Sequence, residues 1–521
     1  MTTPDGDPAI HGSSATALWQ GLMGRGDAGS GEVGSYIDGA LHPGDGEQIG
    51  LVDPADEQQI LAYADGGAEA VDAAVQAAQI AQQRWWGMTA SERGRVLWRT
   101  GQLLREQREP IARLEARTGG KVLADARAET TKVAEMFEYY AGWADKQHGE
   151  VIPVPTTHLT YTLREPFGVV AQMTPWNAPV FTAGWQLAPA LAAGNGVVLK
   201  PSELTPLTSI VLARLIEQAG APQGLVAVIA GLGPTAGQRL VTHPGIGKVV
   251  FVGSPATGRR ISAAAAEQLI PCVLELGGKS ANIVFEDADL ERAVGGAAAA
   301  IFSGAGQSCV AGSRLLVQRS VHDQVVERLG ELAQSLRQGD PLEAGTQVGP
   351  VQNRAQLERI TELVDGATGR GETSGGTGRR AEVVAGGTRL ERPGFFFPPT
   401  VLAGVTNADP IAQQEVFGPV VAVIPFDDEA EAVQIANDTD FGLAGAVWTG
   451  AVDRAHRVAR RLRAGTIWVN SYKTINVMAP FGGFGHSGHG RSSGLDGLME
   501  YSEPKAVWVE TDAEAPLAFG Y

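Results

Sequence analysis

Cysteine is nearly absent from this chain of 521 residues, which contains only Cys272 and Cys309. Two thiols in so long a chain do not form a disulfide framework, and they are compatible with a reducing compartment. The sequence also lacks an apolar run of about 20 residues, the length that a membrane-spanning helix requires. We therefore expect a cytoplasmic protein that does not interact with membranes.

A secretory signal is missing as well. Residues 1–33 begin with Thr, Pro, Asp and Gly residues, and no basic segment is followed there by an apolar one. We predict that this segment is a mobile tail.

Positive charge is in deficit, with 41 Lys and Arg residues against 58 Asp and Glu residues and a formal net charge of -17. An acidic surface repels phosphate backbones, which argues against a nucleic-acid partner. The 44% of hydrophobic and 19% of charged residues are typical of a globular protein. The length predicts about two or three domains.

Most of the chain alternates between short β-branched runs and segments with helical spacing of apolar residues. This alternation predicts an α/β fold with parallel sheets. Strands are predicted at 169–173, 196–199, 225–229, 248–252, 281–285 and 314–317, with a possible edge strand at 506–510. Helices are predicted at 68–86, 91–118, 184–191, 205–219, 235–241, 290–302 and 321–336, and a flexible Gly-rich insertion at 366–380.

Cys309 lies in the stretch GQSCVAGSR, after a predicted helix and before a predicted strand. Its small neighbours would let a ligand approach the sulfur. A lone cysteine is more often a buried structural residue, because reactivity depends on its pKa and its access to solvent. We interpret Cys272, within a predicted buried strand, as such a core residue.

Glu275 lies between two leucines in the stretch LELGGKS. Apolar neighbours would remove water from the carboxyl group and raise its pKa, as a general base requires. The paired glycines would let the backbone pass close to a ligand. The alternative is a glutamate at a strand end that faces water.

Two further motifs follow predicted strands, at the edge where open α/β sheets bind ligands. In TPWNAP, the amide of Asn177 could donate to an oxyanion. In LKPSE, Lys200 and Glu203 could bind adjacent ribose hydroxyls, and a carboxylate there would repel a 2′-phosphate. The alternatives are a Pro-rich turn and a surface ion pair. The glycines of 231–237 are only a weak dinucleotide fingerprint, because the third glycine comes one place late.

In this order and spacing, the motifs resemble those of the aldehyde dehydrogenase superfamily over residues 34–510. The most specific are ELGGKS with Glu275 and GQSC with Cys309, which lies 34 residues further on. PWN at 175–177, KPSE at 200–203, FVGS at 251–254, EVFGP at 415–419 and PFGG at 480–483 support the match.

The resemblance implies an aldehyde dehydrogenase fold and the hydrolytic reaction of that superfamily. The Cys309 thiolate would attack a small-molecule aldehyde, and Asn177 would hold the oxyanion. Hydride transfer to NAD would leave a thioester, and Glu275 would activate water to hydrolyse it. Glu203 favours NAD, with NADP as a weaker alternative, and no metal is expected.

The resemblance also implies the organisation of the chain and of its sites. Residues 34–149 and 168–275 would form a Rossmann-like NAD-binding domain, 276–476 a catalytic domain, and 150–167 and 491–510 the oligomerisation arm of a homodimer or homotetramer. The cofactor would be bound by Thr174, Pro175, Trp176, Lys200, Ser202, Glu203, Gly233, Phe251, Gly253, Ser254, Thr257, Leu276, Gly277, Glu415 and Phe417. The substrate channel would be lined by Ala178, Thr182, Trp185, Ser303, Ser308, Val310, Ile475 and Phe481.

The sequence departs from its relatives at several of these positions. Ala178, Ser303 and Ile475 stand where some relatives have aromatic residues, so the channel should suit a medium-sized aldehyde. Its lining shows no clear clamp for an anion or a quaternary ammonium group. Gln186 and Ser492 replace a lysine and a glutamate that some relatives use to move protons, which leaves the proton route from Glu275 open.

Three other functions compete with this hypothesis. An acylating dehydrogenase that uses coenzyme A is disfavoured because such relatives typically lack the glutamate found here as Glu275. A cysteine hydrolase would need a histidine beside Cys309. A binding protein that had lost catalysis would not be expected to keep Cys309, Glu275 and Asn177 together. We assign no catalytic role to His486 and His489, since a lone histidine is more often structural.

Overall fold

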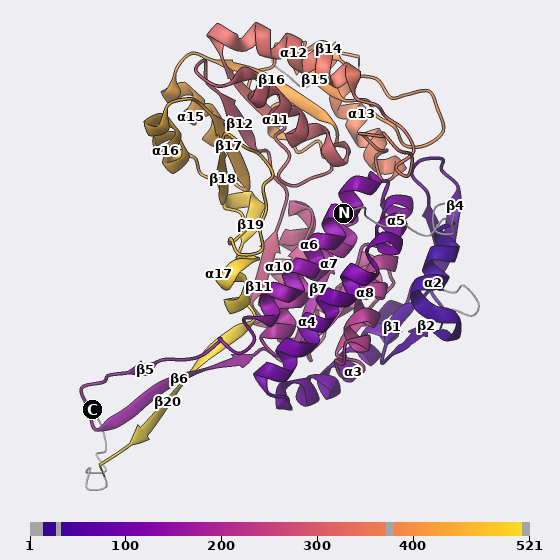
Figure 1. The fold of residues 1–521 in the computed structure, drawn as a ribbon, viewed down its shortest axis with the longest axis vertical. Helices are drawn as coiled ribbons and strands as arrows, with labels where there is room; N and C mark the ends of the chain where they lie inside the picture. The colour runs from indigo at the N-terminus through magenta and orange to yellow at the C-terminus, as the bar shows by residue number, and fades with distance from the viewer. Residues whose placement is uncertain (1–13, 28–32, 371–379, 513–521) are drawn as a thin grey trace, which may run out of the picture.

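The computed structural model describes residues 14–27, 33–370 and 380–512, and its architecture confirms the α/β class expected from the sequence (Figure 1). The first sheet has the strand order β19-β11-β10-β7-β8-β9-β1-β2, in which β11 to β9 are parallel. Its strands are β19 (Gly488–His489), β11 (Cys272–Glu275), β10 (Lys248–Val252), β7 (Val169–Thr174), β8 (Gly196–Pro201), β9 (Val226–Val228), β1 (Ser35–Ile37) and β2 (Ala40–His42).

Helices cover both faces of this sheet, because its strands are apolar on both sides. Val170 packs on one face and Ala171 on the other, as the twofold alternation of a strand requires. On one side lie α3 (Gly67–Gly87), η1 (Gly233–Gly237), α9 (Gln238–Val241) and α10 (Pro255–Glu267), and on the other α7 (Pro179–Ala192) and α8 (Leu207–Gln218). Outside α7 and α8 lie α4 (Ala90–Glu106), α5 (Arg108–Gly119) and α6 (Leu123–Ala141).

The second sheet has the order β14-β15-β16-β13-β12-β17-β18 and is parallel except for β14. Its strands are β12 (Ala281–Val284), β13 (Arg314–Gln318), β14 (Glu382–Ala385), β15 (Thr400–Ala403), β16 (Val420–Phe426), β17 (Ala444–Trp448) and β18 (Thr466–Val469). Its helices are α11 (Leu290–Phe302), η2 (Ser303–Gly306), η3 (Arg319–Val321), α12 (His322–Ser335), α13 (Arg354–Thr368), α14 (Pro410–Gln413), α15 (Glu429–Asn437) and α16 (Val452–Arg461). Separate apolar clusters cover its two faces.

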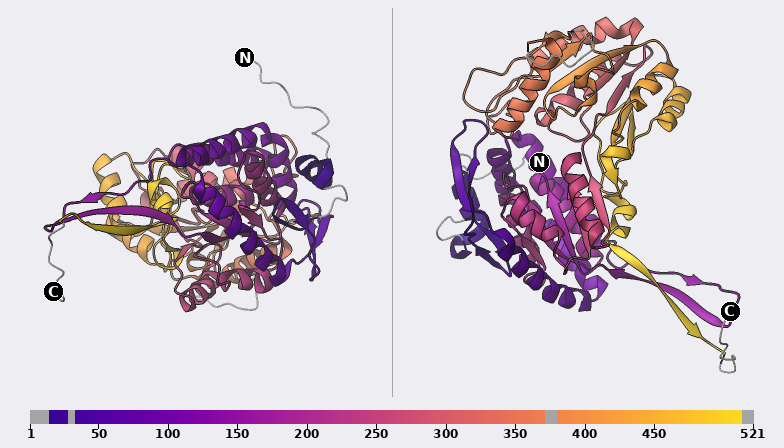
Figure 2. Two further views of the ribbon diagram at one scale, coloured as in Figure 1. Left: turned by 90° about the horizontal axis from the view of Figure 1, so that it is seen from below. Right: turned by 180° about the vertical axis from the view of Figure 1, so that it is seen from behind.

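A narrow antiparallel sheet projects from the body of the molecule as an arm (Figures 1 and 2). It pairs β5 (Val151–Ile152), β6 (His158–Pro166) and β20 (Ser502–Glu510), so the edge strand predicted at 506–510 is confirmed. The preceding turn η4 (Gly485–Ser487) and helix α17 (Gly494–Met499) stay with the body, where Leu498 and Tyr501 are buried. The arm sheet therefore begins at Ser502 and not at residue 491.

Several predicted boundaries are wrong for local reasons. The predicted helix 91–118 is broken at Gln107, because Pro110 cannot donate the helical hydrogen bond that its position requires. α7 begins earlier than residue 184, at Pro179, because proline is favoured in the first turn of a helix. Residues 366–368 of the predicted insertion form the last turn of α13, and residues 371–379 lie outside the described ranges.

The prediction of a mobile tail is wrong for part of residues 1–33. Residues Ala15–Asp27 form helix α2, in which Leu18, Trp19, Leu22 and Met23 are buried against the main core. This spacing places the four side chains on one helical face. A hairpin of β3 (Gln48–Val52) and β4 (Gln59–Ala64) lies beside it. Within the described ranges, no helix combines the length and apolar character needed to span a membrane.

Candidate active site

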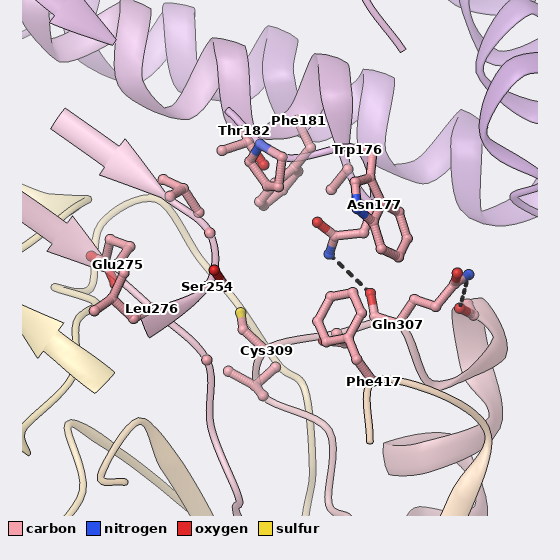
Figure 3. Close-up of a pocket in the computed structure, with 18 of the residues that line it drawn as sticks. Trp176, Asn177, Phe181, Thr182, Ser254, Glu275, Leu276, Gln307, Cys309 and Phe417 are labelled. Atoms are coloured by element: carbon pink, nitrogen blue, oxygen red, sulfur yellow. Dashed lines mark hydrogen bonds between the residues drawn. The ribbon is translucent and has the colours of Figure 1, made fainter. Parts of the chain in front are cut away.

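A cavity of about 980 Å³ lies between the first and the second sheet and receives side chains from both. Cys309, Glu275 and Asn177 all line it, although they are far apart in the sequence. Figure 3 shows the Cys309 side chain with Glu275 on one side and Asn177 and Phe417 on the other. The cavity thus brings together the thiol, carboxyl and amide groups that the sequence singled out.

Cys309 is held by a tight turn after α11. Gly304, Ala305 and Gly306 have left-handed φ angles of 64°, 53° and 70°. A Cβ atom on Gly306 would lie 2.0 Å from the carbonyl oxygen of Gly418, so only glycine fits there. The turn therefore fixes the nucleophile loop against the segment that contains Phe417.

The thiol of Cys309 is poorly solvated. Burial raises the pKa of Cys309 to about 12, and the carboxyl groups of Glu415 and Glu275 add to this rise. Lys473 and the backbone N–H of Val310 lower it. At neutral pH the sulfur is therefore mostly protonated, and Lys473 is the cation that favours its ionised form.

Glu275 is the last residue of β11 and points into the cavity from a buried position (Figure 3). Its backbone is fixed by pairing with Gly488 of β19 and by a 3.1 Å hydrogen bond from the N–H of Gly253. Burial raises the pKa of Glu275 to about 8, which the Ser492 hydroxyl and Arg491 partly oppose. A carboxyl group with such a pKa is suited to act as a general base near neutral pH.

A hydrogen-bonded chain of uncharged side chains lies behind Glu275. Gln186 donates to the Ser492 hydroxyl at 3.1 Å, and the Tyr501 hydroxyl donates to Gln186 at 2.6 Å. Burial raises the pKa of Tyr501 well above its usual value. None of these three side chains titrates near neutral pH. They therefore hold one another in place behind Glu275 and do not accept or release its proton.

Asn177 lies in the loop between β7 and α7. Its amide donates a 2.9 Å hydrogen bond to the carbonyl oxygen of Gln307, two residues before Cys309 (Figure 3). An amide carries two N–H bonds, so this contact can orient Asn177 while the second N–H faces a ligand. The tie to Gln307 was not visible in the sequence, because the two residues come from different sheets.

Most of the residues expected to bind the cofactor lie along the carboxyl edge of the first sheet, whereas Glu415 and Phe417 precede β16 of the second sheet. At the end of β8, Lys200 Nζ lies 3.8 Å from a carboxyl oxygen of Glu203, and burial lowers the pKa of Lys200. Ser254 caps the N-terminus of α10 by accepting from the N–H of Thr257 at 3.3 Å. Pro175, Trp176, Gly253, Ser254, Leu276, Gly277, Glu415 and Phe417 line the cavity, whereas Thr174, Lys200, Ser202, Glu203, Gly233, Phe251 and Thr257 do not border it.

Glu415 approaches the glycines of the ELGGKS stretch. Its carboxyl group accepts a 3.0 Å hydrogen bond from the N–H of Gly278, and a Cβ atom on Gly277 would lie 2.1 Å from a carboxyl oxygen of Glu415. Burial raises the pKa of Glu415 to about 7. These glycines therefore allow Glu415 to reach the cavity wall, where Phe417 meets Trp176 edge to face at 5.3 Å.

All eight side chains expected in the substrate channel border the cavity: Ala178, Thr182, Trp185, Ser303, Ser308, Val310, Ile475 and Phe481. Trp185 has ring contacts of 5.0 Å to Phe181 and 4.9 Å to Phe481, which also border the cavity. Its indole N–H donates to the Ser493 hydroxyl. The apolar part of the channel is thus rigidly packed.

The sequence analysis missed Lys473, Phe181 and several charged residues of α6 that also line this cavity. Phe181 is four residues before Trp185 on the same helix and could have been found from helical spacing. Lys473 carried no signal, because it follows β18 in a segment without a motif. Cys272 packs against the core beneath the first sheet, as expected, but it is only half-buried and its sulfur lies 3.9 Å from His489.

The histidines near the C-terminus have partners other than Cys309. His486 lies 3.2 Å from Asp440, and His489 lies beside Cys272. A cysteine hydrolase needs a histidine that hydrogen-bonds to its thiol. The observed pairing therefore argues against that alternative.

Comparison with known proteins agrees with this geometry. The family model described as "Aldehyde dehydrogenase family" matches residues 42–507. A betaine aldehyde dehydrogenase of Bacillus subtilis is 41% identical over 92% of this chain and 98% of its own length, and human retinal dehydrogenase 2 is 41% identical over 89% of both chains. The solved NAD⁺ complex of a Bacillus cereus aldehyde dehydrogenase is 40% identical, with a TM-score of 0.89 over 92% of this chain and 97% of that one.

The match covers the nucleophile loop, the ELGGKS stretch, the whole second sheet and the first sheet except for the edge strands β1 and β2. Its extent and identity exclude a local resemblance of motifs. The chain is therefore a member of the aldehyde dehydrogenase family.

Proposed function

We propose that this protein oxidises an aldehyde to the carboxylic acid with NAD, through a thioester on Cys309 that water hydrolyses. The observation that carries the proposal is the meeting of Cys309, Glu275 and Asn177 in one cavity. These side chains supply a nucleophile, a base and an oxyanion donor, which together complete the reaction.

In the first half-reaction, the thiolate form of Cys309, after loss of its proton, attacks the aldehyde carbon and forms an anionic thiohemiacetal. Asn177, oriented by its bond to Gln307, donates its free N–H to the developing oxyanion, and the backbone N–H of Cys309 joins it. NAD, when bound, accepts the hydride that this carbon loses. The product on the protein is a thioester.

In the second half-reaction, Glu275 takes a proton from a water molecule that attacks the thioester carbon. The carbon–sulfur bond breaks, the acid leaves, and Cys309 returns to its starting state. The buried position of Glu275 supports this role, because its raised pKa makes the carboxylate a stronger base than an exposed glutamate.

The carboxyl edge of the first sheet supports the use of NAD. Glu203 and Lys200 would bind the adenine ribose, with Glu203 disfavouring a 2′-phosphate. Ser254 stands at the N-terminus of the 13-residue helix α10, where backbone N–H groups suit a pyrophosphate. Glu415 and Phe417 would hold the nicotinamide ribose.

Cys309→Ala and Glu275→Gln test this proposal when NADH is followed by its absorbance. Cys309→Ala should abolish NADH formation with every aldehyde. Glu275→Gln should keep a burst of about one NADH per site and then turn over slowly, because hydride transfer precedes the step that needs the base. Turnover by Cys309→Ala, or an equal loss of burst and steady rate in Glu275→Gln, would refute the mechanism.

We also propose that the arm joins subunits into a homodimer or homotetramer. Val151 is 72% and Trp508 is 56% exposed there, although both are large apolar side chains on a narrow sheet. An exposed apolar edge of this kind favours pairing with another chain. Trp508→Glu should lower the mass measured by light scattering, and an unchanged mass would contradict the role of the arm.

A further inference from the structure

Lys473 is a cation that borders the cavity, and its only role so far is to lower the pKa of Cys309. It follows β18, has a left-handed φ of 56°, and is only half-buried because it faces the cavity. Its ammonium group donates a 3.0 Å hydrogen bond to the hydroxyl of Ser303, six residues before the nucleophile. The side chain is therefore directed at the loop that carries Cys309.

The other charged groups on this side of the cavity largely neutralise each other. Lys121 forms an ion pair with Glu129, and Lys132 lies 2.7 Å from Glu135. Among the residues that the structure describes, no carboxyl oxygen lies within 4 Å of the ammonium group of Lys473. Lys473 thus has a hydroxyl partner and no counter-ion.

Asp125 is the remaining charged group near Lys473, and it attracts the ammonium group electrostatically from beyond ion-pair distance. Burial raises the pKa of Asp125, and the nearby Lys121 and Lys473 oppose this rise. Burial also lowers the pKa of Lys473 to about 8, while Asp125, the Cys309 thiolate and Glu129 act in the opposite direction. An ammonium group in such a position gains from an anion that enters the cavity beside it.

The surroundings of Lys473 indicate which anion would fit. The Ser303 hydroxyl accepts from the ammonium group and donates its own proton to the carbonyl oxygen of Ala299 at 2.6 Å, so Ser303 orients Lys473. The remaining N–H bonds of the ammonium group are the donors that a carboxylate can use. Trp185, Phe481, Ile475 and Val310 line the same cavity and offer apolar contact for a hydrocarbon chain. One cation matches a single negative charge better than a phosphate with nearly two.

We propose that Lys473, oriented by Ser303, binds the carboxylate of an aldehyde that carries an acid group at its far end, the semialdehyde of a dicarboxylic acid. The proposal rests on the dehydrogenase function above and names its substrate class. It differs from the expectation that the channel shows no clear clamp for an anion.

The test compares each of three semialdehydes, succinic, glutaric and adipic, with the alkanal of equal carbon number. The wild-type enzyme should show a higher kcat/KM for at least one semialdehyde than for its alkanal. Lys473→Met should lower kcat/KM for that semialdehyde by about 10- to 100-fold, mainly through KM, as expected for loss of a charged hydrogen bond. Lys473→Arg should restore part of the loss.

Two controls separate recognition from other effects. Lys132→Met removes a cation from the same cavity whose charge Glu135 already neutralises, and it should leave the ratio of the two kcat/KM values unchanged. Lys473 also lowers the pKa of the Cys309 thiol, so its removal could slow every aldehyde. The ratio of semialdehyde to alkanal, and not the absolute rate, is therefore the readout.

An equal loss for semialdehyde and alkanal in Lys473→Met would overturn the proposal, as would a wild-type preference for alkanals or for the cationic 4-aminobutanal. In each of these outcomes the alkanals still yield NADH, so the dehydrogenase function stands. Absence of NADH with every aldehyde would refute both proposals together.

Discussion

Glu275 should impose a pH dependence on thioester hydrolysis, with an inflection near pH 8. Its carboxyl group acts as a base only when ionised, and burial raises its pKa to about 8. By this value about 10% of the enzyme carries the active carboxylate at pH 7 and about 90% at pH 9. The hydrolysis rate should therefore rise about tenfold between these two values and then level off.

Stopped-flow measurement of NADH with an uncharged alkanal separates the two half-reactions. The burst reports acylation of Cys309, whose pKa is raised to about 12, so its rate should not level off near pH 8. The steady phase reports hydrolysis wherever a burst is observed, and it should follow the ionisation of Glu275.

Two variants decide whether Glu275 is the titrating group. Glu275→Gln should remove the inflection from its slow steady phase. Lys473→Met should retain it, although burial lowers the pKa of Lys473 to about 8 as well. A steady rate that stays constant between pH 7 and 9 in the wild type, or an inflection that survives in Glu275→Gln, would refute the reasoning.

Three further predictions concern stability, the nucleophile loop and the cofactor. The folded state raises the pKa of Glu275 from 4.5 to about 8, so between these two pH values the unfolding free energy of the wild type, minus that of Glu275→Gln, should fall by about 1.4 kcal/mol per pH unit. Urea unfolding that shows no such fall from pH 5.5 to 7.5 would contradict this. Gly306→Ala should abolish most activity because its Cβ would meet Gly418, whereas Gly295→Ala in α11, with no atom within 4 Å, should keep activity and leave or raise the melting temperature. Glu203→Gln should raise the NADP-to-NAD ratio of kcat/KM by about tenfold, and an unchanged ratio would remove Glu203 from cofactor choice.

Elements with a continuous apolar pattern were predicted well. Residues 248–252 and 290–302 coincide with β10 and α11, because a buried parallel strand and an amphipathic helix leave clear periodicities. The helix α2 was missed, because polar and Gly-rich residues surround its short apolar face and only contact with the core shows that it is buried. The break at Gln107 was missed because both flanking segments favour helix equally.

The residues of the candidate site also differ in whether the local sequence or only tertiary contacts reveal them. Cys309, Glu275 and Asn177 were found from motifs, since each has neighbours that reflect its chemical environment. Lys473 was not found, because its importance lies in the partners that surround it and not in adjacent residues. Gln186 and Ser492 were known as departures from relatives, but their chain of hydrogen bonds to Tyr501 became visible only in the fold.

The sequence by itself determined the family of this protein, the alternation of its strands and helices, and the thiol and carboxyl groups of its reaction. These properties depend on local spacing and on residue type, which can be read from the sequence alone. Tertiary structure decided the pKa of Glu275, the loop that fixes Cys309 against Gly418, and the exposure of an unpaired Lys473 to the cavity. Burial and charge pairing depend on distances between residues remote in the chain, so only the folded structure could set them.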